Sequence, residues 1–223
     1  MMERKISASL MCADLMNLQR SVNELTQCGV EMLHCDVMDG HFVPNWMMFP
    51  DLINAVGDIS DLPLDIHLMI DEPIDMISHL NLRSFDIVSI SYESTSHPQR
   101  ALQAVRDRGA IPALAINPGT PLCAIEELLP DIGMLLLMTV NPGFSGQKMI
   151  PQSIDKISRA RQTLDSRGYT DLPIEVDGNC SFENVPLMVR AGASIIVAGT
   201  SSIFRKGLAL PQGVHMLRQA MQT

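Results

Sequence analysis

The sequence predicts an α/β fold, a single (β/α)8 barrel that spans residues 1–223. Short runs rich in β-branched residues, Leu or Met alternate with longer segments of helical spacing, which is the pattern of repeated βα units. There are eight such runs, and a chain of 223 residues is long enough to close one barrel. No Gly/Ser-rich linker or charge run divides the chain. One domain is therefore the simplest organisation.

The expected strands and helices alternate along the chain. The strands are residues 5–10, 31–37, 64–69, 87–90, 111–116, 134–138, 174–176 and 195–198. The helices are residues 14–26, 50–56, 73–80, 98–108, 122–129, 153–167, 182–191 and 208–221. Helix ends are expected at Gly29, Gly109, Gly168 and Gly192. An open doubly wound sheet is the alternative fold, but its GxGxxG motif is missing after the first strand.

Composition and charge exclude several classes of function. The chain is 46% hydrophobic and 18% charged, which supplies a sizeable core. With 16 Lys and Arg against 25 Asp and Glu, its net charge of -9 should repel nucleic acid and anionic membrane surfaces. We find no secretory signal, no run of about 18 apolar residues and no CxxC pair among the five cysteines. These features favour a globular cytoplasmic protein without nucleic-acid or membrane partners.

Polar side chains end three of the predicted strands, where a barrel places its active site. Residues 34–36 are His-Cys-Asp, residues 65–67 are Asp-Ile-His, and residues 175–177 are Glu-Val-Asp. Because strand side chains alternate, the first and third residue of each triplet share a face. The residues that could converge are His34, Asp36, His67 and Asp177. Such a set suits one divalent metal ion such as Zn, Fe, Mn or Co, and a hydrogen-bonded polar cluster is the alternative.

Three loops on the same side of the barrel are candidates for substrate contacts. Residues 39–45 (DGHFVPN) and 141–147 (NPGFSGQ) are Gly/Pro loops that could be ordinary turns or a lid. Gly199 and Thr200 follow the last strand and lead toward a short helix, whose backbone N–H groups could hold a phosphate. Gly178 and Asn179 could add donors to the same site.

The chain resembles the ribulose-phosphate 3-epimerase family over essentially its whole length. The matching segments are SL at 9–10, HCDVMDGHFVPN at 34–45, HLM at 67–69, NPGT at 117–120, MTVNPGFSGQ at 138–147, EVDG at 175–178 and GT at 199–200. The resemblance implies a barrel isomerase for a ketose phosphate, with the metal bound by the four strand-end residues. It also implies that Asp36 and Asp177 are the catalytic acid/base pair.

The resemblance implies further contacts with the substrate. Ser9 is placed near the substrate, and Met38, Met69 and Met138 cap the reacting carbons, although methionines at such positions could equally fill the core. The implied phosphate-binding residues are Gly143, Phe144, Ser145, Gly146, Gly178, Asn179, Gly199 and Thr200.

The resemblance implies a hexulose phosphate or a pentulose phosphate as the substrate. The segments 9–12, 138–140 and 199–204, together with Cys180, are similar to the branch that acts on D-allulose 6-phosphate, and D-ribulose 5-phosphate is the alternative. Ser91 stands where the family commonly has a histidine.

The resemblance leaves two alternative functions to consider. A non-catalytic sugar-phosphate-binding homologue is one alternative, because Ser91 departs from the family pattern and a fold does not guarantee a function. A Schiff-base aldolase or a lysine-dependent decarboxylase is disfavoured, because no lysine ends a predicted strand. The chain could also form a homo-oligomer.

Overall fold

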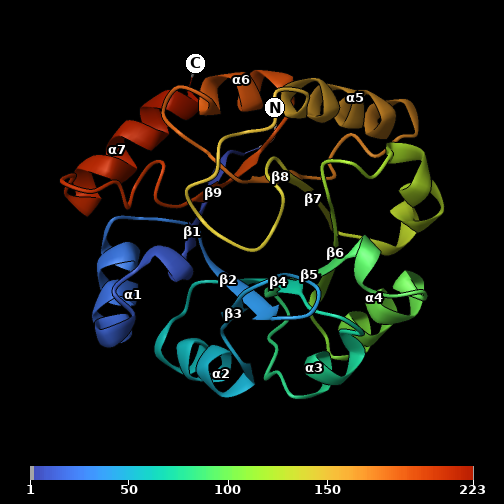
Figure 1. The fold of residues 1–223 in the computed structure, drawn as a ribbon, viewed down its shortest axis with the longest axis horizontal. Helices are drawn as coiled ribbons and strands as arrows, with labels where there is room; N and C mark the ends of the chain where they lie inside the picture. Colours follow the sequence, from blue (N-terminus) through green and yellow to red (C-terminus); the bar gives the residue numbers. More distant parts are fainter. Residues whose placement is uncertain (1–2, 223) are drawn as a thin grey trace.

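A computed structural model describes residues 3–222, so Met1, Met2 and Thr223 of the expected domain lie outside the described residues. The parallel barrel strands are β1 (Lys5–Ser9), β2 (Met32–Asp39), β4 (Leu64–Met69), β5 (Ile87–Ser91), β6 (Ile111–Ile116), β7 (Met134–Met138), β8 (Ile174–Asp177) and β9 (Ile195–Ala198). Strand β1 pairs with both β2 and β9, which closes the barrel (Figure 1). The predicted (β/α)8 fold is confirmed.

Helices surround the barrel. They are α1 (Leu18–Gln27), α2 (Pro50–Ile59), α3 (Ile74–Ser78), α4 (Pro98–Asp107), α5 (Ser153–Ser166), α6 (Val185–Ala191) and α7 (Leu210–Met221). Short 3₁₀ helices are η1 (Leu10–Cys12), η2 (Leu15–Asn17) and η3 (Tyr92–Ser94). The predicted glycine helix ends are confirmed by positive φ angles at Gly29, Gly109, Gly168 and Gly192. Among residues 3–222, none of the helices has the length and hydropathy needed to span a membrane.

Two expected helices differ from the structure. The segment after β6 is a 3₁₀ helix, η4 (Leu122–Asp131), and it contains Pro130. Proline lacks an N–H and its ring crowds the carbonyl four residues earlier, so an α-helix cannot continue there. The short helix expected after Gly199 is wrong as well, because residues 200–204 form consecutive turns. The N–H of Phe204 bonds to the Gly199 carbonyl, five residues back, instead of entering an α-helical ladder.

Strand β3 (Trp46–Met47) was not predicted, and it folds the loop after β2 back over the barrel mouth. It pairs antiparallel with the end of β2, with Met47 beside Met38. The Asp39 carboxylate accepts bonds from the N–H groups of His41 and Phe42, at 2.8 and 2.9 Å, which starts the turn. Gly40 has φ of 73°, and a Cβ there would lie 2.3 Å from the Trp46 ring. The tight turn therefore requires glycine.

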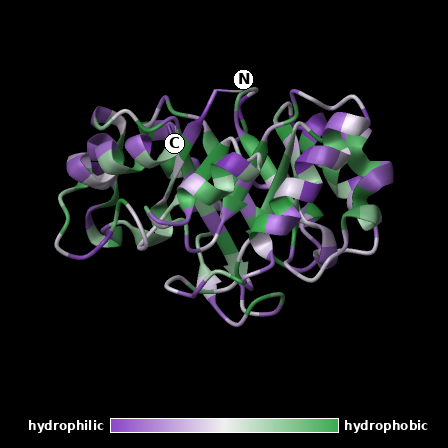
Figure 2. Cartoon of the chain, turned by 90° about the horizontal axis from the view of Figure 1, so that it is seen from above, coloured by the Kyte–Doolittle hydropathy of each residue, from purple (hydrophilic) through white to green (hydrophobic). Residues whose placement is uncertain are grey.

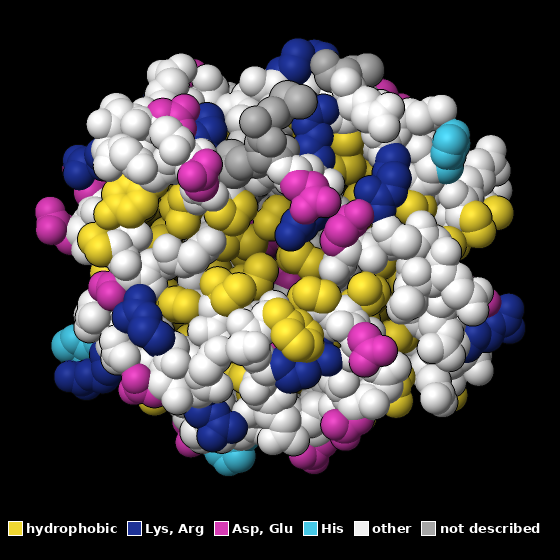
Figure 3. Space-filling view, turned by 180° about the vertical axis from the view of Figure 1, so that it is seen from behind, with side chains coloured by type: hydrophobic (Ala, Val, Ile, Leu, Met, Phe, Trp, Pro, Cys, Tyr) yellow, Lys and Arg dark blue, Asp and Glu magenta, His cyan; other side chains and the backbone are white. Residues whose placement is uncertain are grey.

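Apolar side chains fill the space between barrel and helices and also the barrel's N-terminal end. Figure 2 shows hydrophobic strands at the centre and hydrophilic stretches on the surrounding helices. Near the strand starts, a separate apolar cluster consists of Met32, Ile87, Ala113, Met134 and Ile195. Figure 3 shows apolar side chains at the centre of the face opposite the mouth, ringed by charged side chains.

Lys156 is a buried lysine of α5 that holds the loop after β6. Its Nζ donates to the carbonyls of Asn117, Pro118 and Thr120 at 2.7, 3.2 and 2.7 Å, and the residue is only 7% exposed. We predict that Lys156→Met lowers the free energy of unfolding by about 1–3 kcal/mol, because buried carbonyls lose their charged donor. Urea denaturation would measure this loss.

Arg159→Met on the same helix is the matched control. Arg159 pairs with Asp155 across an exposed helix surface, so its loss should cost less than about 0.5 kcal/mol. Equal stabilities of the two variants would contradict a structural role for Lys156.

Candidate active site

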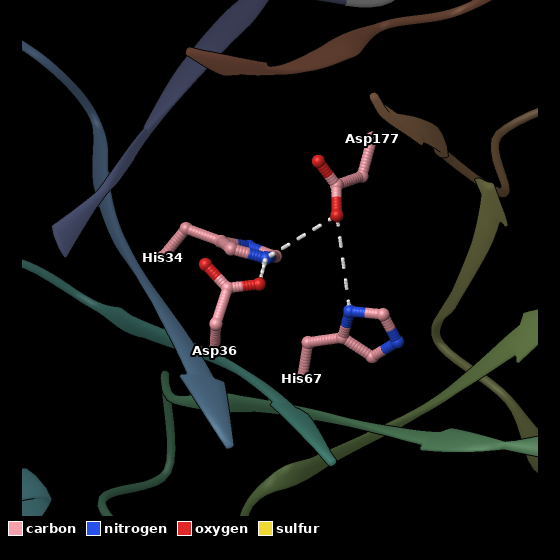
Figure 4. Close-up of side chains that lie close together, drawn as sticks. All are labelled: His34, Asp36, His67 and Asp177. Carbon is pink, nitrogen blue, oxygen red and sulfur yellow. Dashed lines mark ion pairs between the residues drawn. The ribbon is translucent and has the colours of Figure 1, made fainter. Parts of the chain in front are cut away.

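Four polar side chains meet inside the mouth of the barrel, as the sequence predicted (Figure 4). His34 and Asp36 extend from β2, His67 from β4 and Asp177 from β8. Parallel pairing places Asp36 beside His67. One ligand atom from each residue lies within 4.8 Å of the others, a spacing that could hold a metal ion.

The two imidazoles are oriented for a shared ligand. His34 Nε2 lies 3.4 Å from Asp36 Oδ1 and 4.0 Å from Asp177 Oδ2, and His67 Nδ1 lies 3.9 Å from Asp177 Oδ2 (Figure 4). Both nitrogens are buried and have no hydrogen-bond partner. Leaving buried nitrogens unpaired costs free energy unless another group satisfies them. Two imidazole nitrogens with two carboxylates fit a divalent transition metal.

The protonation states of the two histidines differ. Burial lowers the pKa of His34, but the Asp65 and Asp36 carboxylates more than compensate and raise the pKa well above its usual value. Burial and the positive charge of His34 lower the pKa of His67 to about 4. His67 is therefore neutral at pH 7, while His34 must lose a proton before its Nε2 can bind a metal.

The pKa values of the two carboxyl groups in the cluster are shifted in opposite directions. Burial raises the pKa of Asp36, but His34, His67 and a hydrogen bond from Ser9 outweigh it and lower the pKa. The Ser9 hydroxyl donates to Asp36 Oδ2 at 2.9 Å. Burial and the charge of Asp36 raise the pKa of Asp177 to about 7. The two carboxyls therefore favour different protonation states near neutral pH.

A small cavity opens above the cluster. Asp36 and Asp177 line it, whereas His34 and His67 lie below its floor. The residues that the resemblance assigned to substrate and phosphate contacts also line it, and these are Ser9, Met38, Met69, Met138, Gly143, Phe144, Ser145, Gly146, Gly178, Asn179, Gly199 and Thr200. The lining also includes Val197, to which the sequence assigned no role. It further includes members of the segments that the sequence connected with a loop or with the choice of substrate, and these are Met11, Cys12, Val140, Pro142, Gln147, Cys180 and Ser201.

The two Gly/Pro loops contact each other across the mouth, and the yellow loop after β7 crosses the barrel opening (Figure 1). The Asn45 side-chain amide donates to the Gly143 carbonyl at 2.9 Å. A Cβ at Gly143 would lie 3.3 Å from both Val43 and Pro44. The side-chain amide of Gln147 stabilises the second loop by donating hydrogen bonds to the carbonyls of Asn141 and Phe144. The sequence placed both loops beside the site but did not reveal this link, because it joins distant segments.

The end of the cavity near β8 and β9 is built from turns and neutral polar groups. Gly178 has φ of 115° and Asn179 has φ of 48°. The Asn179 amide donates to the Ser201 hydroxyl at 3.2 Å, which ties the two turns together. None of the described residues that line the cavity is Lys or Arg. An anionic group here would be held by backbone N–H groups and hydroxyls.

Ser91, the departure from the family pattern, does not line this cavity. It is buried at the end of β5, and its hydroxyl donates to the Leu68 carbonyl at 3.0 Å. The serine therefore satisfies a backbone group between two strands.

The closed barrel and the polar site at its mouth define this protein as a (β/α)8-barrel enzyme. It belongs to the ribulose-phosphate 3-epimerase family, a family of isomerases whose sequence profile matches residues 5–204. Ribulose-phosphate 3-epimerase from Bacillus subtilis is 41% identical over 197 residues, covering 88% of this chain and 91% of that protein. The Methanocaldococcus jannaschii protein of the same name is 40% identical over 216 residues, covering 97% and 90%.

Solved structures with little sequence identity share the fold. A Streptococcus mutans protein named KGPDC has a TM-score of 0.72 at 10% identity, covering 99% of this chain and 98% of that one. A 3-hexulose-6-phosphate synthase has a TM-score of 0.65 at 15% identity, covering 97% and 99%. At such low identity these similarities support the barrel architecture alone.

We predict that a divalent metal stabilises the metal-free protein. A ligand that binds only the folded state, at about 100 times its Kd, adds about 2.7 kcal/mol to the free energy of unfolding. Titration with Zn²⁺, Mn²⁺, Co²⁺ or Fe²⁺ should therefore raise the Tm. Because His34 gives up a proton on binding, the apparent metal affinity should fall as the pH falls.

His67→Ala should remove most of this metal-dependent rise in Tm, because it deletes a ligand. His215→Ala is the control, since His215 is exposed on α7 and bonds only to Gln219. If none of the four metals raises the Tm, the residues form a polar cluster and not a metal site.

Proposed function

We propose that this protein is a cytoplasmic, single-domain, metal-dependent epimerase that inverts C3 of a ketose phosphate through an enediolate. One observation carries the proposal. Asp36 and Asp177 extend into one site from β2 and β8, and their pKa values are shifted in opposite directions. An inversion that uses two bases needs one ionised carboxylate, which removes a proton, and one protonated carboxyl, which supplies one.

The proposed metal ligands are His34, Asp36, His67 and Asp177. When bound, a divalent metal supplies positive charge that stabilises the enediolate oxygens. The carboxylate of one aspartate removes the C3 proton. The carboxylic acid of the other then delivers a proton from the opposite face, and the two exchange roles in the reverse direction.

Neighbouring side chains support these proton transfers. The Ser9 hydroxyl orients Asp36 and keeps it ionised by donating to Oδ2. Met38, Met69 and Met138 are 5%, 1% and 4% exposed, and all three line the cavity. We assign them the apolar cap over the reacting carbons. The cap excludes water, which strengthens the electrostatic interactions inside the site.

The phosphate is assigned to the turns at the other end of the cavity. The proposed contacts are Gly143, Phe144, Ser145, Gly146, Gly178, Asn179, Gly199 and Thr200. Consecutive backbone N–H groups in turns with positive φ can form an anion-binding nest. This choice suits a protein with a net charge of -9, because local dipoles hold the anion without a cationic side chain.

Asp177→Asn tests the function. The amide cannot carry the proton, so kcat should fall by about 10²-fold to 10⁴-fold while the barrel stays folded. The measurement is incorporation of deuterium at C3 from deuterated water, located by NMR with the metal-loaded protein.

Asp171→Asn is the matched control, because Asp171 is exposed near the opposite end of β8. It should keep wild-type turnover. Near-wild-type turnover by the Asp177 variant would overturn the two-carboxylate mechanism. A wild-type protein that binds ketose phosphates without exchanging C3 would instead be a binding homologue.

The substrate we favour is D-allulose 6-phosphate, with D-ribulose 5-phosphate as the second candidate. Residues that suggested the hexulose, Cys12, Cys180 and Ser201, all line the cavity. A six-carbon substrate carries its phosphate one carbon farther from C3, so discrimination is expected where the turns after β8 and β9 meet. The names of the two relatives described above support the pentulose.

The ratio of kcat/KM for the two ketose phosphates decides between them, because this ratio measures differential binding of the transition states. We expect the larger value for D-allulose 6-phosphate. A larger value for D-ribulose 5-phosphate would assign the pentulose and leave the proposed reaction unchanged.

A further inference from the structure

A buried carboxylate lies directly behind the cluster. Asp65 belongs to β4, two residues before His67, and is 0% exposed. Its Oδ2 lies 2.7 Å from His34 Nδ1 and accepts a hydrogen bond of 2.6 Å from the Ser7 hydroxyl. Register explains the contact, since parallel pairing places Asp65 beside His34. Asp65 thus contacts the side of His34 that faces away from the cavity.

This contact determines which nitrogen of His34 is free. A carboxylate accepts hydrogen bonds, so Nδ1 must carry the hydrogen that it shares with Asp65. Once His34 has lost its second proton, Nε2 presents its lone pair beside Asp36 and Asp177. An imidazole with its proton on Nε2 would lose the Asp65 bond and could not bind a metal there.

A comparison with Asp86 indicates that Asp65 is not placed for stability. Both are 0% exposed. The Asp86 carboxylate is bound by the Arg83 guanidinium and by the backbone N–H groups of Leu64 and Arg83. Asp65 forms no ion pair with any Lys or Arg in the described part of the chain, and its charged partner is His34 of the cluster itself. Burying such a carboxylate is costly, and an apolar residue would serve the core better.

We propose that Asp65 is a positioning residue that fixes the tautomer and orientation of His34 for metal binding. Metal-ligating histidines commonly donate their other N–H to a carboxylate, which holds the ring and makes the ligating nitrogen more basic. Ser7 holds Asp65 in turn. The inference rests on the proposed metal site and assigns the group that prepares one of its ligands.

The test is the Kd for Zn²⁺, measured by competition with a chromophoric chelator, in Asp65→Ala and Asp65→Asn. Losing such a partner typically weakens metal binding by about 10-fold to 100-fold, and we expect this loss for Asp65→Ala. Asp65→Asn should lose less, because the amide oxygen still accepts from Nδ1. Asp86→Asn is the matched control at the start of β5, and it should lower the Tm of the metal-free protein without changing the Kd for Zn²⁺.

A second measurement needs no variant. In zinc-loaded wild-type protein with ¹⁵N-labelled histidine, NMR should show a proton on His34 Nδ1 and zinc on Nε2. Zinc on Nδ1, or an unchanged Kd in a folded Asp65 variant, would overturn the proposal. Deuterium exchange at C3 by the wild-type protein tests the epimerase function separately, so the two failures are distinguishable.

Discussion

Closure of the parallel barrel is the constraint on which the rest of this structure depends. Strand β1 pairs with β2 on one side and β9 on the other, so strands distant in sequence surround one interior. Asp36 and Asp177 can face one substrate only because the barrel is closed. Register matters equally, because a slip of one residue in β2 would turn His34 and Asp36 outward and Cys35 inward.

The barrel interior concentrates polar groups that oppose stability. Buried histidines and carboxyls lie inside the barrel together with the apolar cluster that includes Met134. Glu175 illustrates the cost, since it is fully buried, and burial together with the Asp65 carboxylate raises its pKa well above the usual value. A carboxyl kept neutral in this way avoids the larger penalty of a buried charge. The large hydrophobic core between strands and helices offsets these terms.

Strands and turns contribute different parts of the site. The strand ends hold the proposed metal ligands and acid/base groups within a few ångströms, and barrel pairing keeps them in place. The cavity walls instead come largely from turns, tied together by Asn45 with Gly143 and by Asn179 with Ser201. Under the proposed function, we therefore expect a change of substrate length to alter contacts in the turns and to leave the strand-end groups unchanged.

The sequence by itself determined the alternation of strands and helices, and the period-2 placement of His34 with Asp36 indicated a shared face. Both are local properties of the chain. It missed β3, and it wrongly expected a short helix after Gly199, where turn bonds form instead. The helix expected at residues 122–129 is present, but as the 3₁₀ helix η4. Only the tertiary structure decided that Asp65 contacts His34 and Asn45 contacts Gly143. Such contacts depend on barrel closure and strand register, which relate residues far apart in the chain.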